Sequence, residues 1–338
     1  MRENHTDDAL LRFAYGQMIE HFSDKQVREA AAVRVRDFVA ARHPVPASQA
    51  PAESRQAVAD MAETGVHFFE PFLTRQQCIE VLRHISQLPV YDNQSYSGSS
   101  RTPLLFEQVR NTVPVASYRV DHILQVPHLL EAALSPAIRD LAAAYLGCMP
   151  TMYGCNMYWS FPGHDLVRGV QHFHRDFDDL RFVTLFILLN DVSDAAGSHE
   201  FVQGSHRRDI NLERFANWHG EHARSGEEAE LKQQYRDPRI LFAPNPYIDP
   251  LIHAIFGDRI LRIAGSAGTT FAEDNFGLHR GVPPKGPRLL FWARYGYGPN
   301  AYSARVTPER VPASWLRSRI GDDETLRYLT RMLIDWDA

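Results

Sequence analysis

The spacing of apolar residues changes near residue 150 of the chain. Before that point, apolar residues recur every three or four positions in segments 24–41, 75–85 and 127–147, which predicts amphipathic helices. Thr74 precedes the second segment and Gln77 follows three positions later, so we expect a capping box there. After residue 150, short β-rich runs are separated by turns; they span 151–161, 181–192, 259–273 and 288–298. The pattern predicts a mainly β protein with flanking helices, its strands forming a barrel or a sandwich.

Two segments stand apart from this pattern. Residues 1–55 contain the first predicted helix and, at 43–54, a stretch rich in Pro, Ala and Ser that is typical of a linker. We expect this N-terminal extension to pack on the main body, or else to act as a dimer arm or a substrate lid. Residues 56–338 are expected to form a single domain, interrupted at about 207–256 by a polar, partly helical insertion. The insertion and a Ser-, Asn- and Gly-rich loop predicted at 91–115 are candidates to cover a site.

Composition narrows the classes of function. The 338 residues carry 36 lysines and arginines against 41 aspartates and glutamates, a formal charge of −5, which argues against nucleic acid as a partner. No apolar run approaches the roughly 18 residues of a membrane span, and the N-terminus lacks the apolar segment of a secretory signal. The three cysteines have no CxxC spacing, which favours free thiols in a reducing compartment. We therefore expect a cytoplasmic protein that binds no membrane; the sequence indicates no oligomeric state.

The sharpest chemical feature is the segment QHFHRDFDD, residues 171–179. His174 and Asp176 are two positions apart, so on a strand both side chains point to one face and can reach one metal ion. His279, far downstream beside a strand-like run, is the candidate third ligand. Two histidines and one carboxylate leave other coordination positions open, an arrangement that suits non-haem Fe(II) oxygenases. His172 is a weaker candidate because no carboxylate follows it at the same spacing.

Arg288 is the candidate anion-binding residue. It follows His279 by nine residues and begins the run 288–298. A guanidinium can hold a carboxylate through two parallel hydrogen bonds, so Arg288 could bind the distal carboxylate of 2-oxoglutarate while the keto-acid end chelates the metal. Arg294 shares the face of Arg288 on a regular strand but lies about 20 Å along it, which makes it the weaker candidate.

Three segments resemble the phytanoyl-CoA hydroxylase-like family of Fe(II)/2-oxoglutarate-dependent oxygenases, to which ectoine hydroxylase belongs. They are FHRDFDD at 173–179, a strand and turn ending in GSHR at 185–207, and LHRGVPPKGPR at 278–288. The resemblance covers roughly residues 57–300 outside the insertion and implies a double-stranded β-helix, or jelly-roll, core. It also implies that His174, Asp176 and His279 bind iron and that Arg288 binds 2-oxoglutarate.

The activity that this resemblance implies is hydroxylation of a small molecule by O₂, with release of succinate and CO₂. An amino-acid derivative or a specialised metabolite is the expected substrate. Related halogenases carry a small residue where this chain has Asp176, which favours hydroxylation or a similar hydrogen-abstraction outcome here.

One position departs from the pattern of the wider superfamily. A Ser or Thr often stands two residues after the cosubstrate Arg, but this chain has Leu290 there. A second contact to 2-oxoglutarate must come from neighbouring strands, where Thr184, Asn156 and Tyr158 are the candidates. Two alternatives stay open: a cupin-type metalloenzyme that does not use 2-oxoglutarate, and a non-enzymatic jelly-roll binding protein with a structural metal.

Overall fold

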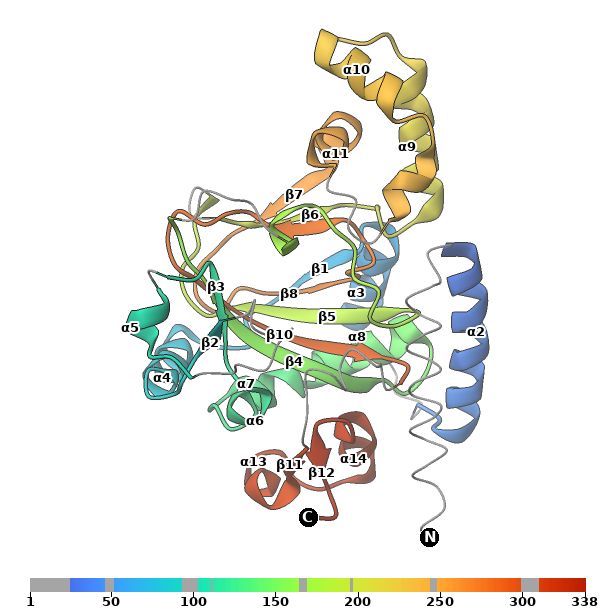
Figure 1. Cartoon of the computed structure of the whole chain (residues 1–338). Helices are drawn as coiled ribbons and strands as arrows, with labels where there is room; N and C mark the ends of the chain where they lie inside the picture. The colour runs from blue at the N-terminus through green and yellow to red at the C-terminus, as the bar shows by residue number, and fades with distance from the viewer. Residues whose placement is uncertain are drawn as a thin grey trace.

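The computed structural model describes residues 25–45, 52–92, 103–110, 112–163, 169–194, 197–243, 248–298 and 310–338. Within these residues the chain forms a large and a small antiparallel sheet, with helices outside them (Figure 1). The large sheet has the strand order β1-β8-β5-β10-β4-β3-β2 and the small sheet the order β7-β6-β9. The strands of the large sheet are β1 (Val66–Phe69), β2 (Tyr91–Asp92), β3 (Val115–Ser117), β4 (Thr151–Ser160), β5 (Phe182–Leu188), β8 (Thr270–Glu273) and β10 (Arg288–Gly296). Those of the small sheet are β6 (His199–Val202), β7 (Ile260–Ile263) and β9 (His279–Gly281).

The path of the chain between the sheets identifies a double-stranded β-helix. His174 forms an antiparallel bridge with His279, which adds the His174 segment to the small sheet beside β9. From β4 the chain thus passes to the small sheet, returns to the large sheet in β5, and crosses to β6 and β7. It then continues through β8, β9 and β10, changing sheet at each step. This topology confirms the predicted fold class, a jelly-roll core with flanking helices.

Helices cover the outer face of the large sheet because alternate strand residues there are apolar. In β10, Leu289, Phe291 and Ala293 are buried against these helices, whereas Leu290 belongs to the cluster between the sheets. Burying each leucine or phenylalanine stabilises the fold by about 1.5–3 kcal/mol. The helices on this side are α3 (Ala52–Glu63), α4 (Arg75–Ile85), α5 (Phe106–Val109), α6 (Val120–Ile123), α7 (Leu129–Ala133), α8 (Pro136–Leu146), α13 (Arg317–Ile320) and α14 (Glu324–Thr330). Near the C-terminus, β11 (Val311–Pro312) pairs with β12 (Ile334–Asp335) in parallel.

The insertion builds a hydrophobic cluster of its own. Its helices are α9 (Arg208–Gly220), α10 (Gly226–Gln234) and α11 (Asp249–Phe256), and in Figure 1 α9 and α10 extend away from the two sheets. The cluster includes Phe173 and Leu278, which directly precede His174 and His279. The insertion therefore packs against the backbone that carries two of the predicted ligands.

Several local predictions can be compared with these elements. The helices expected at 24–41, 75–85 and 127–147 are α2 (Lys25–Arg42), α4 and the pair α7–α8. Both capping-box hydrogen bonds between Thr74 and Gln77 are present, so that prediction is confirmed.

Two loop predictions are wrong in part. The loop expected at 91–115 contains β2, α5 and the start of β3. The strand β2 pairs with β3, β3 pairs with β4, and Phe106 of α5 packs against Trp159 of β4. Residues 93–102 and 111 lie outside the described residues. The linker expected at 43–54 ends earlier, because α3 begins at Ala52 and buries Ala57 and Met61; residues 46–51 are not described.

Two further observations bear on the protein's surroundings. All three cysteines are free and buried. Among the described helices, none combines the length and the apolar character needed to span a bilayer.

Candidate metal centre

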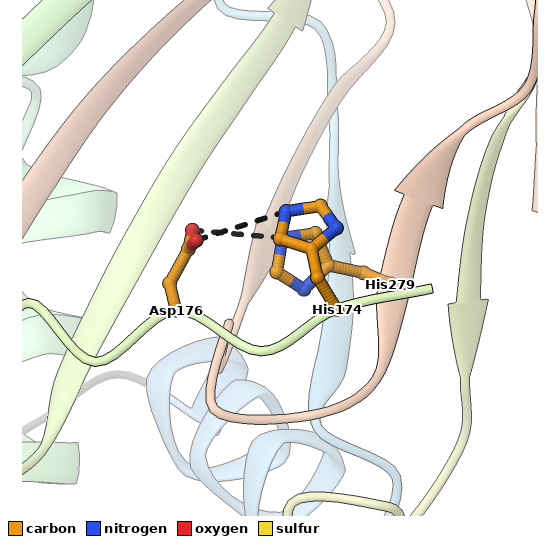
Figure 2. A group of neighbouring side chains, drawn as sticks. All are labelled: His174, Asp176 and His279. Carbon is orange, nitrogen blue, oxygen red and sulfur yellow. Dashed lines mark ion pairs between the residues drawn. The ribbon is translucent and has the colours of Figure 1, made fainter. Parts of the chain in front are cut away.

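His174, Asp176 and His279 meet between the two sheets, as the sequence predicted. One potential ligand atom from each lies within 4.8 Å of the others. Nε2 of His174 is 3.7 Å from Oδ1 of Asp176, and Nε2 of His279 is 3.5 Å from Oδ2 of the same carboxylate. Figure 2 shows the carboxylate facing both imidazoles. Neighbouring ligands that bind one ion at about 2.1 Å lie about 3 Å apart, so small side-chain rotations would let these residues hold a metal.

The backbone fixes which imidazole nitrogen faces the centre. Nδ1 of His174 donates to the carbonyl of His172, and Nδ1 of His279 donates to the carbonyl of Gly277, each at 2.9 Å. Each Nε2 therefore carries the lone pair that a metal needs. Burial, together with the charge on His279, lowers the pKa of His174 to about 4, so this imidazole is neutral at pH 7.

Arg294 is part of this centre, although the sequence suggested it only as a weaker cosubstrate anchor. Its guanidinium donates to Oδ2 of Asp176, pairs with Asp178, and lies 4.4 Å from the centre of the Trp292 ring. Burial alone would raise the pKa of Asp176, but Arg294 and His279 outweigh it and hold that pKa well below its usual range. Asp176 is therefore ionised and held in place without a metal.

The same carboxylate shifts the pKa of His279 in the opposite direction. Burial alone would lower its pKa, but Asp176 raises it above the ordinary value. Below this raised pKa, His279 of the metal-free chain carries a proton, and that proton competes with a metal ion for the imidazole.

Arg288 lies deeper between the sheets and is 3 % exposed. Its Nη1 donates to the carbonyls of Gly197 and Ser198 at 2.6 and 3.0 Å, and its Nη2 makes a weak contact of 3.4 Å with Oγ of Ser160. Nε has no hydrogen-bond partner, and no carboxylate among the described residues pairs with this guanidinium. Burial accordingly lowers the pKa of Arg288, opposed by Tyr158. A buried cation bound only by neutral groups is suited to receive an anion.

Gly281 brings Arg288 close to the metal ligands. A Cβ atom at Gly281 would lie 2.6 Å from Nη2 of Arg288, so any larger residue there would push the guanidinium out of its present position. Gly281 stands two residues after His279 on β9, a rise of about 6.6 Å. The five-carbon chain of 2-oxoglutarate spans a comparable length.

The three secondary cosubstrate candidates all lie on the inner face of the large sheet, but not together. Tyr158 is near enough to Arg288 to influence its pKa. Thr184 lies opposite Arg294 and Glu273 in the strand register, and its buried hydroxyl has no partner among the described residues. Asn156 uses its Oδ1 to accept from the backbone N–H of Met157.

A second buried pair, which the sequence analysis did not predict, lies behind the metal ligands. His199 and Glu273 share a hydrogen bond of 2.9 Å, and both are almost fully buried. Burial raises the pKa of Glu273 to about 8 and lowers that of His199 well below its usual value, so both are neutral at pH 7. The His199 ring stacks 5.8 Å from that of His279. The only sequence signal was an acidic residue ending an apolar strand, which does not identify a partner.

Comparisons with known proteins give weak similarities. No family model and no curated protein matches the chain. Among solved structures, EctD from S. alaskensis with bound Fe is 17% identical with a TM-score of 0.47, covering 75% of this chain and 80% of that one. The epimerase SnoN from nogalamycin biosynthesis, in complex with Fe3+, alpha ketoglutarate and nogalamycin RO, is 15% identical with a TM-score of 0.46, covering 72% and 84%. These similarities assign the chain to no family, so the function of the site must be argued from its own geometry.

Proposed function

We propose that the protein is an Fe(II)- and 2-oxoglutarate-dependent oxygenase that hydroxylates a small molecule. The observation that supports this most directly is the pairing of two features between the sheets. One is the cluster of two imidazoles and one carboxylate, and the other is the buried Arg288, which has no carboxylate partner among the described residues. A metal-binding end and a cationic end, about two strand residues apart, fit a keto acid with a second carboxylate.

Each residue of the site has a distinct task in this proposal. His174, Asp176 and His279 hold Fe(II), which supplies the activation of O₂ that side chains cannot provide. Arg288 binds the distal carboxylate of 2-oxoglutarate and so orients the keto-acid end toward the metal ligands. Arg294 holds one oxygen of Asp176 and thereby fixes the orientation of the carboxylate.

The apolar residues between the sheets have a separate role. Phe186, Phe271 and Leu290 are 3 %, 0 % and 1 % exposed. They exclude water from the space between the sheets, which strengthens the electrostatic interactions there.

The substrate class remains part of the proposal. We infer an amino-acid derivative or a specialised metabolite, oxidised with release of succinate and CO₂. The carboxylate of Asp176 supports hydroxylation because, with a metal bound, it would take the coordination position that a halide would need.

An anaerobic titration tests the proposed function. Adding Fe(II) and then 2-oxoglutarate to the metal-free protein should produce a weak visible charge-transfer band that needs both components. Asp176→Ala should lose the band, and admitting O₂ to the wild-type complex should yield succinate. Screening amino-acid derivatives and specialised metabolites for faster succinate release would then identify the substrate.

The same experiment separates the two alternatives. A cupin-type enzyme would bind metal and consume O₂ without any response to 2-oxoglutarate. A structural metal would resist removal by chelators, and its removal would unfold the protein. Either result would contradict the proposed function.

A further inference from the structure

Phe276 connects the metal centre to two parts of the chain outside the jelly roll. It lies in the short connection between β8 and β9, three residues before His279, and is 6 % exposed. The guanidinium carbon of Arg28 is 5.0 Å from the centre of its ring, and that of Arg175 is 5.4 Å away. Phe177, which follows Asp176, meets the ring edge-on at 5.2 Å. The segment that carries Asp176 and the segment that carries His279 thus contact each other through aromatic rings.

Arg28 of α2 reaches this cluster with its guanidinium. It is 1 % exposed, and its guanidinium carbon lies 4.9 Å from the centre of the Phe177 ring as well as near Phe276. It also donates to the backbone carbonyl of Asp179, in the segment that follows Asp176. A desolvated cation bound to two aromatic faces holds both rings in place.

The rest of α2 contacts the body only in part. Ala32 and Val39 are buried in a small cluster with Leu146 and Leu180. A cavity of about 290 Å³ lies between α2 and the body, and its lining on the helix side includes Arg28, Ala32, Val33 and Arg36. Among the described residues of α2, Arg28 is the most deeply buried.

Arg175 holds the same connection from the side of the insertion. It stands between His174 and Asp176 and is 2 % exposed. Its guanidinium donates to the backbone carbonyls of Phe276, Ser205 and Leu241 and to Oδ1 of Asn211. Asn211 and Leu241 belong to the insertion, so Phe276 is held from both sides.

We propose that Arg28 is a positioning residue for the metal centre. By binding Phe177 and Phe276 together, it fixes the segment after Asp176 relative to the segment before His279. Through Arg28, the N-terminal helix takes part in setting the geometry of the metal site. This inference rests on the proposed metal site but does not depend on 2-oxoglutarate or on the substrate.

Co(II) binding tests the inference, because the d–d absorption of Co(II) reports the geometry of its ligands. Arg28→Met keeps the length and apolar stem of the side chain but removes the charge. We expect it to weaken Co(II) binding about tenfold, equivalent to about 1.4 kcal/mol, and to change the absorption spectrum. Arg28→Lys retains a cation for the two rings and should recover most of the affinity. Arg34→Met, an exposed position on the same helix, is the matched control and should behave as wild type.

Two further measurements separate positioning from simple stabilisation. Phe177→Leu should also weaken Co(II) binding, and combining it with Arg28→Met should add little, since both act through one contact. If Arg28→Met lowers only the melting temperature and leaves affinity and spectrum unchanged, the inference is wrong. If Arg28→Met does not fold, Phe177→Leu protein with wild-type Co(II) affinity and spectrum overturns the inference equally. If Asp176→Ala binds Co(II) as tightly as wild type, the proposed metal site itself is contradicted.

Discussion

Replacing Arg288 by methionine is the most direct way to test the cosubstrate site. The substitution keeps an unbranched side chain in the space between Gly281 and the carbonyls of Gly197 and Ser198 but removes the charge. A carboxylate bound there would be buried without a partner, which costs about 3–5 kcal/mol. Taking the lower figure, 2-oxoglutarate should bind more than a hundredfold more weakly, since each 1.4 kcal/mol is about a tenfold change. Arg288→Lys restores the charge but not the two parallel hydrogen bonds, so its affinity for 2-oxoglutarate should lie between those of wild type and Arg288→Met.

Calorimetry under anaerobic conditions measures the affinities for the metal and for 2-oxoglutarate. Mn(II) is titrated first, and 2-oxoglutarate is then titrated into the metal-loaded protein. Arg288 touches none of the three predicted metal ligands, so Mn(II) affinity should remain within about threefold of wild type. A thermal unfolding scan of the variant checks that the loss of two hydrogen bonds from a charged group, each worth about 1.5–3 kcal/mol, has not unfolded it.

Two results would refute this reasoning. Folded Arg288→Met protein that binds 2-oxoglutarate within threefold of wild type would show that the anchor lies elsewhere. An equal loss of Mn(II) and 2-oxoglutarate affinity would show that Arg288 supports the fold of the site and not the cosubstrate.

Three further predictions concern the surroundings of the metal centre. Gly281→Ala should weaken 2-oxoglutarate binding in calorimetry and lower the melting temperature, because its Cβ would displace Arg288; unchanged values for both would contradict the close packing. The pKa of Glu273 is raised from 4.5 to about 8, so the folded state keeps a proton that the unfolded state loses between these values. Stability of the metal-free protein should therefore fall by up to about 1.4 kcal/mol per pH unit across that window. In urea unfolding with a chelator present, the stability of Glu273→Gln should increase relative to that of wild type as pH rises from 5.5 to 8. Parallel pH profiles of the two proteins would argue against the buried proton. Asp176 raises the pKa of His279, so Co(II) affinity should fall about tenfold per pH unit below that pKa, and a flat profile down to pH 5.5 would exclude His279 as a ligand.

The parts of the fold that the sequence predicts are those set by local spacing. The helix after Thr74 follows from its capping box and apolar stripe. The strands β4 and β10 follow from β-rich runs that are bounded by turns. The meeting of His174 and Asp176 with His279 was predictable because few residue types bind metals and the spacing within 174–176 is local. The loop expected at 91–115 failed because β2 and β3 are too short to show a period of their own.

Contacts that depend on strand register could not be predicted in this way. Arg294, Thr184 and Glu273 come from β10, β5 and β8, and the register aligns them across the large sheet. A shift of two residues in either pairing would give each of them different neighbours without changing the hydrophobic pattern. The contact of Arg294 with Asp176 and that of Glu273 with His199 therefore became visible only in the folded chain.

The two arginines of β10 show why charge, and not sequence spacing, distinguishes their roles. Both point between the sheets, but Arg294 has Asp176 and Asp178 as partners, whereas Arg288 is bound by neutral groups. With neutral His174 and Glu273 and a deprotonated His279, the metal end carries one net negative charge and the Arg288 end one positive charge. A divalent cation with one carboxylate of a dicarboxylic acid would neutralise the first end, and the other carboxylate would neutralise the second. Because uncompensated charge is costly between buried sheets, this balance favours Fe(II) with 2-oxoglutarate over a metal bound alone. We therefore expect each of the two to bind more tightly when the other is present.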